Sequence, residues 1–175
     1  QLLYAPDYNG YVYENSCVIF LFSIEDASLL CVQAADYIVD VKTANNPGDT
    51  AYLANYKAPA ALGTLPVSLN FRLLGELYTL PVPVSALLDD GWELVRGKDV
   101  GAGARGGLQM KKDGEIWSFQ SANYSRRQVD AAHCVITGVS QDSVETCTPL
   151  VIAPDLQIGS TEDAYRLREN DTELP

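Results

Sequence analysis

The chain has 175 residues and a net charge of −11, from 12 basic and 23 acidic side chains. Its length suits one domain or two small ones, and an apolar share of 47% is ordinary for a globular protein, which argues against wholesale disorder. The negative charge repels phosphate backbones and anionic lipid surfaces, which argues against a nucleic-acid partner. The longest uncharged apolar run, residues 17–22, is too short for a transmembrane segment, which needs about 20 residues.

The N-terminal part has the pattern of a small β-sheet. Residues 11–13 alternate with polar neighbours, and residues 17–24 form the strongest predicted strand of the chain. Residues 29–32 follow after a polar turn, so the two segments predict a hairpin. Residues 37–41 can add another strand.

Residues 43–66 differ in character from the segments on either side. Residues 45–49 have turn chemistry, and Pro59, Gly63 and Pro66 interrupt an alanine-rich stretch in which residues 50–56 can form a short helix. We therefore predict a β-rich unit over 1–42, a linker over 43–66, a second β-rich unit over 67–150 and a strand-turn-helix segment over 151–175. The helix within 154–175 can complete the first unit.

The second unit is predicted to be mostly strand. Lys112-Asp113-Gly114-Glu115 is a good hairpin turn, and Gly91 ends a short helix. The expected strands cover residues 67–73, 76–80, 92–95, 108–111, 116–121, 133–139 and 143–149, with the short helix at 86–90 and a glycine-rich loop at 98–107. The fold class expected is α+β, mainly antiparallel β-sheet with few short helices, in one or two small units.

Four cysteines leave the redox state open. A tight turn at residues 140–141 would place Cys134 opposite Cys147, which permits a disulfide, whereas Cys17 and Cys31 fall about five positions out of register. The alternative, which we favour, is that all four are small buried apolar side chains. A metal site is not expected, because the sequence has no C-x-x-C spacing and one histidine.

Two motifs have the form of known sites without their context. Residues 101–106 match G-x-G-x-x-G, but a dinucleotide site needs a helix next, and a strand-like segment follows here. A flexible loop without cofactor is therefore expected. Asp130, His133 and Cys134 have the residue types of a catalytic triad, but on a strand His133 and Cys134 point to opposite faces. We expect no catalytic role for them.

Paired acids occur at residues 25–26, 89–90 and 162–163, each at a turn or a helix end. Their spacing gives no support for a glycosidase-like carboxylate pair. Residues 7–10 begin like a calcium loop but lack its terminal acid. A hydrolase whose catalytic carboxylates lie far apart in the sequence and come together only in the folded chain is an alternative function.

Tyrosines are numerous in this chain, and Tyr4, Tyr8, Tyr11 and Tyr13 cluster near its start. An exposed cluster of this kind can bind sugars, peptides or protein surfaces, so these four residues are the predicted binding surface. The alternative is a strand whose aromatic side chains alternate between the core and a sheet face. Residues 123–125 and 170–172 are formal glycosylation sequons, which have no meaning in a bacterial protein.

Several loose motifs over residues 68–165 resemble a group of exported proteins and lipoproteins from Gram-positive, often gut, bacteria. They are Phe71-x-Leu73-x-Gly75-x-x-Tyr78-x-Leu80-Pro81, Leu87-x-x-x-Gly91-Trp92, Gly114-x-Ile116 with Asn123-x-Ser125, Cys134-Val135 leading to Gly138-Val139, and Ile158-Gly159-Ser160-Thr161-Glu162-Asp163. The resemblance implies a helix-plus-sheet module similar to that of β-lactamase-inhibitor-like proteins. It transfers no catalytic residue. Arg168-Glu169-Asn170 departs from the glycine and proline expected after the helix.

The resemblance also bears on the two ends of the chain. Residues 155–163 predict a strand, a turn and a helix start with Ser160 or Thr161 as N-cap, and in such modules sequence like residues 1–41 follows that helix. We therefore expect either a fragment of tandem modules or a final helix that packs back on residues 1–41. No signal peptide is recognisable, so export would require a leader outside this sequence.

The function expected is a non-enzymatic cell-surface or secreted module that binds protein or carbohydrate through a sheet face. The alternatives are an extracellular hydrolase with a carboxylate site and an inhibitor of a secreted enzyme.

Overall fold

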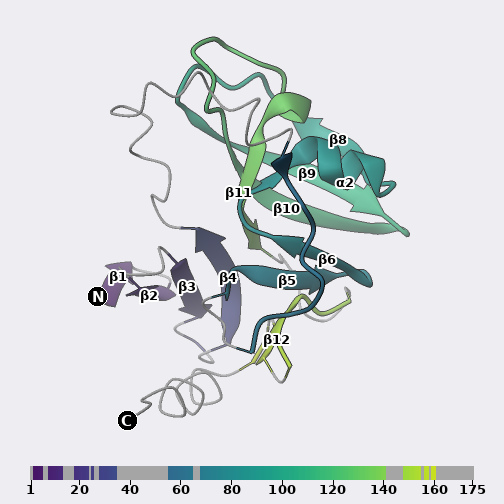
Figure 1. Cartoon of the computed structure of the whole chain (residues 1–175). Helices are drawn as coiled ribbons and strands as arrows, with labels where there is room; N and C mark the ends of the chain where they lie inside the picture. The colour runs from purple at the N-terminus through teal and green to yellow at the C-terminus, as the bar shows by residue number, and fades with distance from the viewer. Residues whose placement is uncertain are drawn as a thin grey trace.

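The computed structural model describes residues 2–5, 8–13, 18–23, 25, 28–34, 55–64, 68–140, 148–154, 156–157 and 159–160 (Figure 1). For residues 2–13, 18–20, 30, 33 and 34 within these ranges, only the backbone is described. The described part is mostly antiparallel β-sheet with one short α-helix, as the sequence predicts. The predicted strand at 37–41 and most of the predicted strand at 143–149 and helix at 50–56 lie outside the described residues. Residues 148–149 are not in a strand, and residue 56 is not helical.

A nine-stranded antiparallel sheet forms the larger layer. Its main path runs β1-β2-β3-β4-β11-β10-β9-β8, and the short strand β7 pairs with β11 off this path. The strands are β1 (Leu2–Ala5), β2 (Tyr8–Tyr13), β3 (Val18–Ser23), β4 (Leu29–Ala34), β7 (Val82–Pro83), β8 (Glu93–Gly97), β9 (Arg105–Lys112), β10 (Glu115–Ala122) and β11 (Val135–Ser140). Because Val32 of β4 pairs with Val139 of β11, the N-terminal strands and the later strands share one sheet. The division into units around residues 43–66 stays a prediction.

A smaller sheet of four strands has the order β13-β12-β5-β6. Its strands are β5 (Asn70–Leu73), β6 (Glu76–Thr79), β12 (Val151–Ala153) and β13 (Leu156–Gln157). The predicted strand over 67–73 begins later than expected, at Asn70, because Leu69 has a φ of +62° and interrupts the extended backbone. The predicted strand at 76–80 is confirmed as β6.

Two of the hairpins turn through two residues with positive φ. Asp113 and Gly114, with φ of 52° and 89°, connect β9 to β10 as the sequence predicts. Leu74 and Gly75, with φ of 48° and 88°, connect β5 to β6 in the same way. Positive φ at both positions gives the turn the twist of the flanking strands, and glycine takes that conformation without steric cost.

Two helical segments flank β11. The helix α2 (Val84–Asp89) begins two residues before the predicted one, and Gly91, with φ of +85°, ends it as expected. The predicted strand over 133–139 is wrong at its start, because residues 131–133 form the 3₁₀ helix η3 (Ala131–His133). Asp130 caps this helix by accepting a hydrogen bond from Ala132 N at 2.8 Å, a local alternative to strand pairing.

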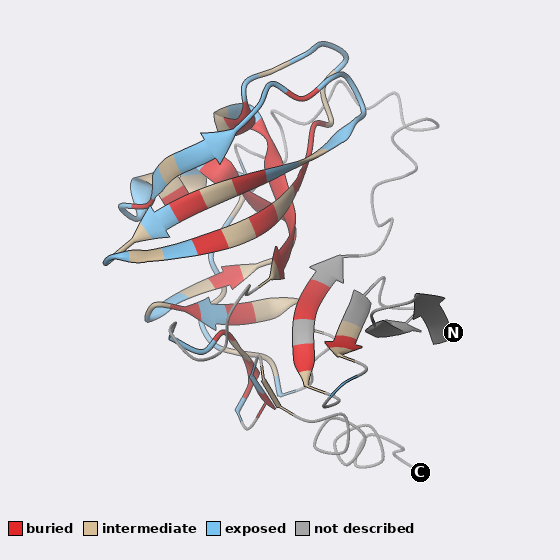
Figure 2. Cartoon of the chain, turned by 180° about the vertical axis from the view of Figure 1, so that it is seen from behind, coloured by how far each residue is buried: buried red, intermediate tan, exposed pale blue. Residues whose placement is uncertain are grey.

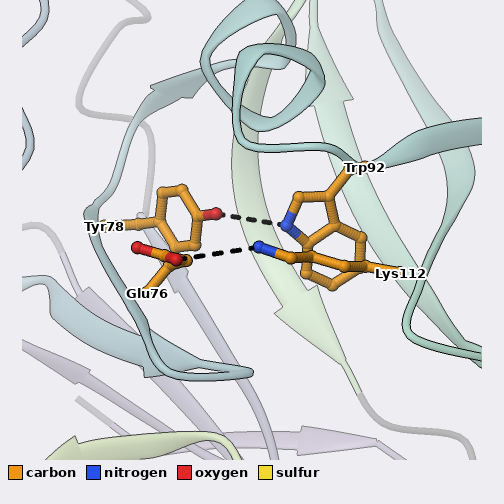
Figure 3. Close-up of polar contacts among 4 residues, drawn as sticks. All are labelled: Glu76, Tyr78, Trp92 and Lys112. Atoms are coloured by element: carbon orange, nitrogen blue, oxygen red, sulfur yellow. Dashed lines mark hydrogen bonds and ion pairs between the residues drawn. The ribbon is translucent and has the colours of Figure 1, made fainter.

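One continuous hydrophobic core joins the two sheets and α2. Figure 2 shows buried positions alternating with more exposed ones along β9 and β10, the pattern of strands with one covered face, whereas β11 is buried along most of its length. The largest buried side chains include Trp117, Tyr78 and Phe22. At the joint between the sheets, Trp92 Nε1 donates to Tyr78 Oη at 3.1 Å, and Lys112 Nζ lies 3.9 Å from Glu76 Oε1 (Figure 3).

The last described residues return to the N-terminal part of the chain. Leu29 N donates to Ser160 O at 2.8 Å, and Gly159 N donates to Leu29 O at 2.9 Å. The predicted helix after residue 160 lies outside the described residues, so its packing on residues 1–41 stays a prediction. Among the described residues, no helix is long and apolar enough to cross a membrane.

Candidate functional site

A pocket of about 490 Å³ opens where β8, β9 and β10 meet the glycine-rich loop. It is lined by residues 96–101 from the end of β8 and the loop, 105–109 from β9, and 118–119 from β10. We call this hollow the basic pocket. Its volume lies within the range of small-molecule sites, roughly 300–1,000 Å³.

Gly107, which has no side chain, lines the basic pocket. Along β9, Leu108 and Met110 are buried in the core, so Arg105, Gly107 and Gln109 lie on the opposite face. A Cβ built on Gly107 would have only the backbone oxygen of Phe119 nearby, at 3.9 Å. The space above Gly107 is therefore open, between the positions of Arg105 and Gln109.

A polar row crosses the three strands beside this opening. Arg96 pairs in register with Gln109, and Gln109 pairs with Ser118. Gln109 Nε2 donates to Ser118 Oγ at 3.4 Å. Neighbouring strands lie about 4.8 Å apart, so a cation, an amide and a hydroxyl stand within the reach of one small polar ligand.

The basic pocket has the opposite charge to the rest of the chain. Residues 96–112 carry five basic side chains and one acidic one, whereas the remainder carries 7 basic and 22 acidic side chains. Arg96, Lys98 and Arg105 line the pocket, together with one carboxylate, that of Asp99. Asp99 Oδ2 accepts a hydrogen bond from Gln128 Nε2 at 3.0 Å. Among the described residues, no carboxylate forms an ion pair with Arg96 or Lys98.

Asn123 holds the loop that forms one wall of the pocket. It is 1% exposed, and its Nδ2 lies 2.8 Å from Val100 O, 3.0 Å from Gly101 O and 2.7 Å from Arg127 O. Its Oδ1 accepts from Ser125 N at 2.8 Å. One side chain thus ties the loop before β9 to the loop after β10. Because this amide is buried and engaged, Asn123 cannot accept a glycan in the folded chain.

The predicted tyrosine surface lies at the far end of the long sheet from the basic pocket. Tyr4 lies on β1, and Tyr8, Tyr11 and Tyr13 lie on β2. Tyr11 pairs in register with Phe20, and Tyr13 with Val18. Their side chains lie outside what the structure describes, so the proposed binding role of this cluster stays a prediction.

Asp130, His133 and Cys134 differ in exposure and role, and the expectation that they have no catalytic function stays a prediction. His133 is exposed, whereas Cys134 is 1% exposed and borders the core. Burial, and then the negative charge of Asp130, raise the pKa of the Cys134 thiol to about 11, so it is protonated at neutral pH. Burial likewise raises the pKa of Cys31 to about 12. Both are free buried thiols, while Cys17 and Cys147 lie outside the described residues.

The paired acids that fall in the described part occupy structural positions. Glu25 is exposed, and its backbone N donates to Ser23 Oγ at 3.1 Å, while Asp90 caps the end of α2. Residues 26, 162 and 163 lie outside the described part. No group of three or more His, Cys, Asp or Glu among the described residues could hold a metal ion.

The basic pocket lies partly in residues 98–107, where the sequence predicts a flexible loop and no site. The prediction that no helix follows G-x-G-x-x-G is confirmed, since β9 starts at Arg105. The signal that could have found the pocket is a local excess of basic residues in an acidic chain. Comparison with protein-family models, curated proteins and solved structures finds no match to this chain.

Proposed function

We propose that this chain is a non-catalytic module of a cell-surface or secreted protein that binds carbohydrate in the basic pocket. The observation that carries the proposal is the pocket itself, an open hollow with an amide, a hydroxyl and cations at its rim. Gln109 and Ser118 offer the hydrogen-bonding groups that sugar hydroxyls require. The acidic composition and the resemblance to exported proteins support the location.

The lining favours carbohydrate over a protein partner. The apolar lining residues Val100, Leu108 and Phe119 are 2–6% exposed, and Leu108 lies with its register partner Phe119 on the core side of the sheet, so they offer no apolar anchor site. Protein interfaces usually depend on aromatic or aliphatic anchors in such sites. In the part of the chain that the structure describes, the large exposed apolar side chains are Val95 and Ile116, and both lie outside the lining.

The lining also favours binding over hydrolysis. Glycosidases use two carboxyl groups about 5–10 Å apart. Asp99 is the one carboxylate among the pocket-lining residues, and Gln128 engages it. A sugar in this pocket would meet hydrogen-bond donors and positive charge without an acid and base pair on either side.

Glycan-array binding of the fluorescently labelled chain tests the proposal, with Gly107→Ala, Gly107→Val and Gly107→Leu as a graded series. Alanine adds a Cβ without a clash, because the nearest heavy atom to it is 3.9 Å away, and valine and leucine extend further into the pocket. Strands tolerate these residues at least as well as glycine, so urea unfolding should show stability that is unchanged or raised. We expect glycan binding that declines from alanine to leucine.

The matched control is Lys111→Leu, on the same strand and the same face but outside the pocket lining. It should bind as the wild type does. Absence of glycan binding by the wild type, or equal binding by wild type and Gly107→Leu, would show the proposal to be wrong.

A further inference from the structure

The charge of the lining points to a narrower ligand class: we infer that the basic pocket selects acidic saccharides, in which a sugar carries an anionic group. This inference rests on the proposed function and concerns the same pocket. The anionic group can be the carboxylate of a uronic acid or a phosphate ester, since both accept hydrogen bonds from guanidinium and ammonium groups.

The positive charge is concentrated where the ligand would lie. Arg96, Lys98 and Arg105 come from the end of β8, the loop and the start of β9, which are brought together by the pairing of Gly97 with Leu108. Asp99 is held by Gln128 Nε2 at the same rim. Among the described residues, no carboxylate forms an ion pair with Arg96 or Lys98, so the positive charge of the lining exceeds its negative charge there.

The contrast between the pocket and the whole chain makes the inference testable through salt. A ligand attracted by exposed basic side chains binds more weakly as salt rises, because salt screens the attraction. If the overall charge of −11 dominated, an anionic ligand would be repelled, and salt would strengthen its binding by screening that repulsion. The sign of the salt dependence therefore tells local attraction from overall repulsion.

Isothermal titration calorimetry with trigalacturonic acid and its methyl ester tests the selection, because the two ligands share their rings and differ in charge. We expect the acid to bind at least tenfold more tightly than the ester at low salt, and more weakly as salt rises. Arg96→Gln and Lys98→Gln should each weaken binding of the acid roughly tenfold, as the loss of one charge-assisted contact implies. Lys111→Gln, with the same charge change outside the lining, should stay within about twofold.

A parallel titration with glucuronate and glucose 6-phosphate identifies which anionic group the pocket prefers. Whichever of the two binds more tightly, its binding supports the inference. Equal binding of acid and ester, or an equal effect of Lys111→Gln and Arg96→Gln, would overturn it. If neutral glycans bind and Gly107→Leu abolishes that binding, the acidic class is wrong while the proposed function stands. If neither charged nor neutral glycans bind, both are wrong.

Discussion

The buried amide of Asn123 offers the sharpest test of how the pocket wall is held. Replacement by alanine removes three contacts from Nδ2 to carbonyl groups, at 2.7–3.0 Å, and one from Ser125 N to Oδ1 at 2.8 Å. Nδ2 carries two N–H groups, so the side chain makes at most three hydrogen bonds, and at about 1 kcal/mol each the upper value is about 3 kcal/mol. The three carbonyl groups keep a second partner, since Val129 N, Ala104 N and Ser125 Oγ also donate to them. We therefore expect a loss of about 3 kcal/mol.

Urea unfolding measures this loss through the shift of the midpoint at constant slope. For a chain of this length, about 3 kcal/mol corresponds to a melting temperature lower by roughly 6–12 °C. Hydrogen exchange should accelerate in residues 98–104 before it does in β10. The matched control is Gln128→Ala, which removes one exposed hydrogen bond to Asp99 and should change stability by no more than about 0.5 kcal/mol.

Asn123→Asp tests the same contacts through the pH dependence of stability. An aspartate carboxylate facing three carbonyl groups has no donor to offer, so the fold should raise its pKa above the ordinary value of about 4. A raised pKa in the folded state means that stability is lost as pH rises through the titration range. The variant should therefore lose most stability relative to the wild type at pH 7 and less near pH 4. A loss for Asn123→Ala below about 1 kcal/mol, or no pH dependence for Asn123→Asp, would refute the reasoning.

Three further predictions concern groups outside the pocket. Burial alone raises the pKa of Glu115, but the hydrogen bonds from Thr148 and from Trp117 outweigh it and lower the pKa. The stabilisation by this carboxylate is therefore complete above about pH 4.5 and is lost as pH falls through the lowered pKa. In urea titrations, Glu115→Gln should cost about 1 kcal/mol at pH 7 and nothing near pH 2. Tyr78→Phe leaves the buried Trp92 Nε1–H without its acceptor and should cost about 1–3 kcal/mol by urea unfolding, and a loss below about 0.5 kcal/mol would contradict that role. Iodoacetamide followed by peptide mapping should leave Cys134 unmodified in the native chain at pH 8 and modify it after unfolding, and rapid native labelling would show that the thiol is not buried.

The local elements of the fold could be predicted from the sequence because their signals are contiguous. Apolar alternation along residues 116–121 and the Asp113-Gly114 turn together determine the hairpin of β9 and β10, and the structure has both. The start of β11 was predicted wrongly because Asp130 offers its own carboxylate to the backbone, which favours a 3₁₀ turn over two more strand residues.

The arrangement of the sheets could not be predicted in the same way. The pairing of Val32 with Val139 joins strands about a hundred residues apart, and neither strand's pattern specifies its neighbour. The small sheet likewise joins Val151 of β12 to Arg72 of β5. Contacts of this range depend on the shape of the whole core, to which all four segments contribute.

The basic pocket escaped prediction because its defining feature is a missing side chain. Glycine within a sequence indicates loop or flexibility, and residues 101–107 contain four glycines among seven positions. Two of them, Gly106 and Gly107, lie inside a strand, where the pleat directs one toward Val100 and the other toward open space. Only the pairing of β8, β9 and β10 shows that the vacant position lies beside three basic side chains. A glycine in a strand, next to charge that opposes the rest of the chain, is therefore a reason to look for a site before flexibility is assumed.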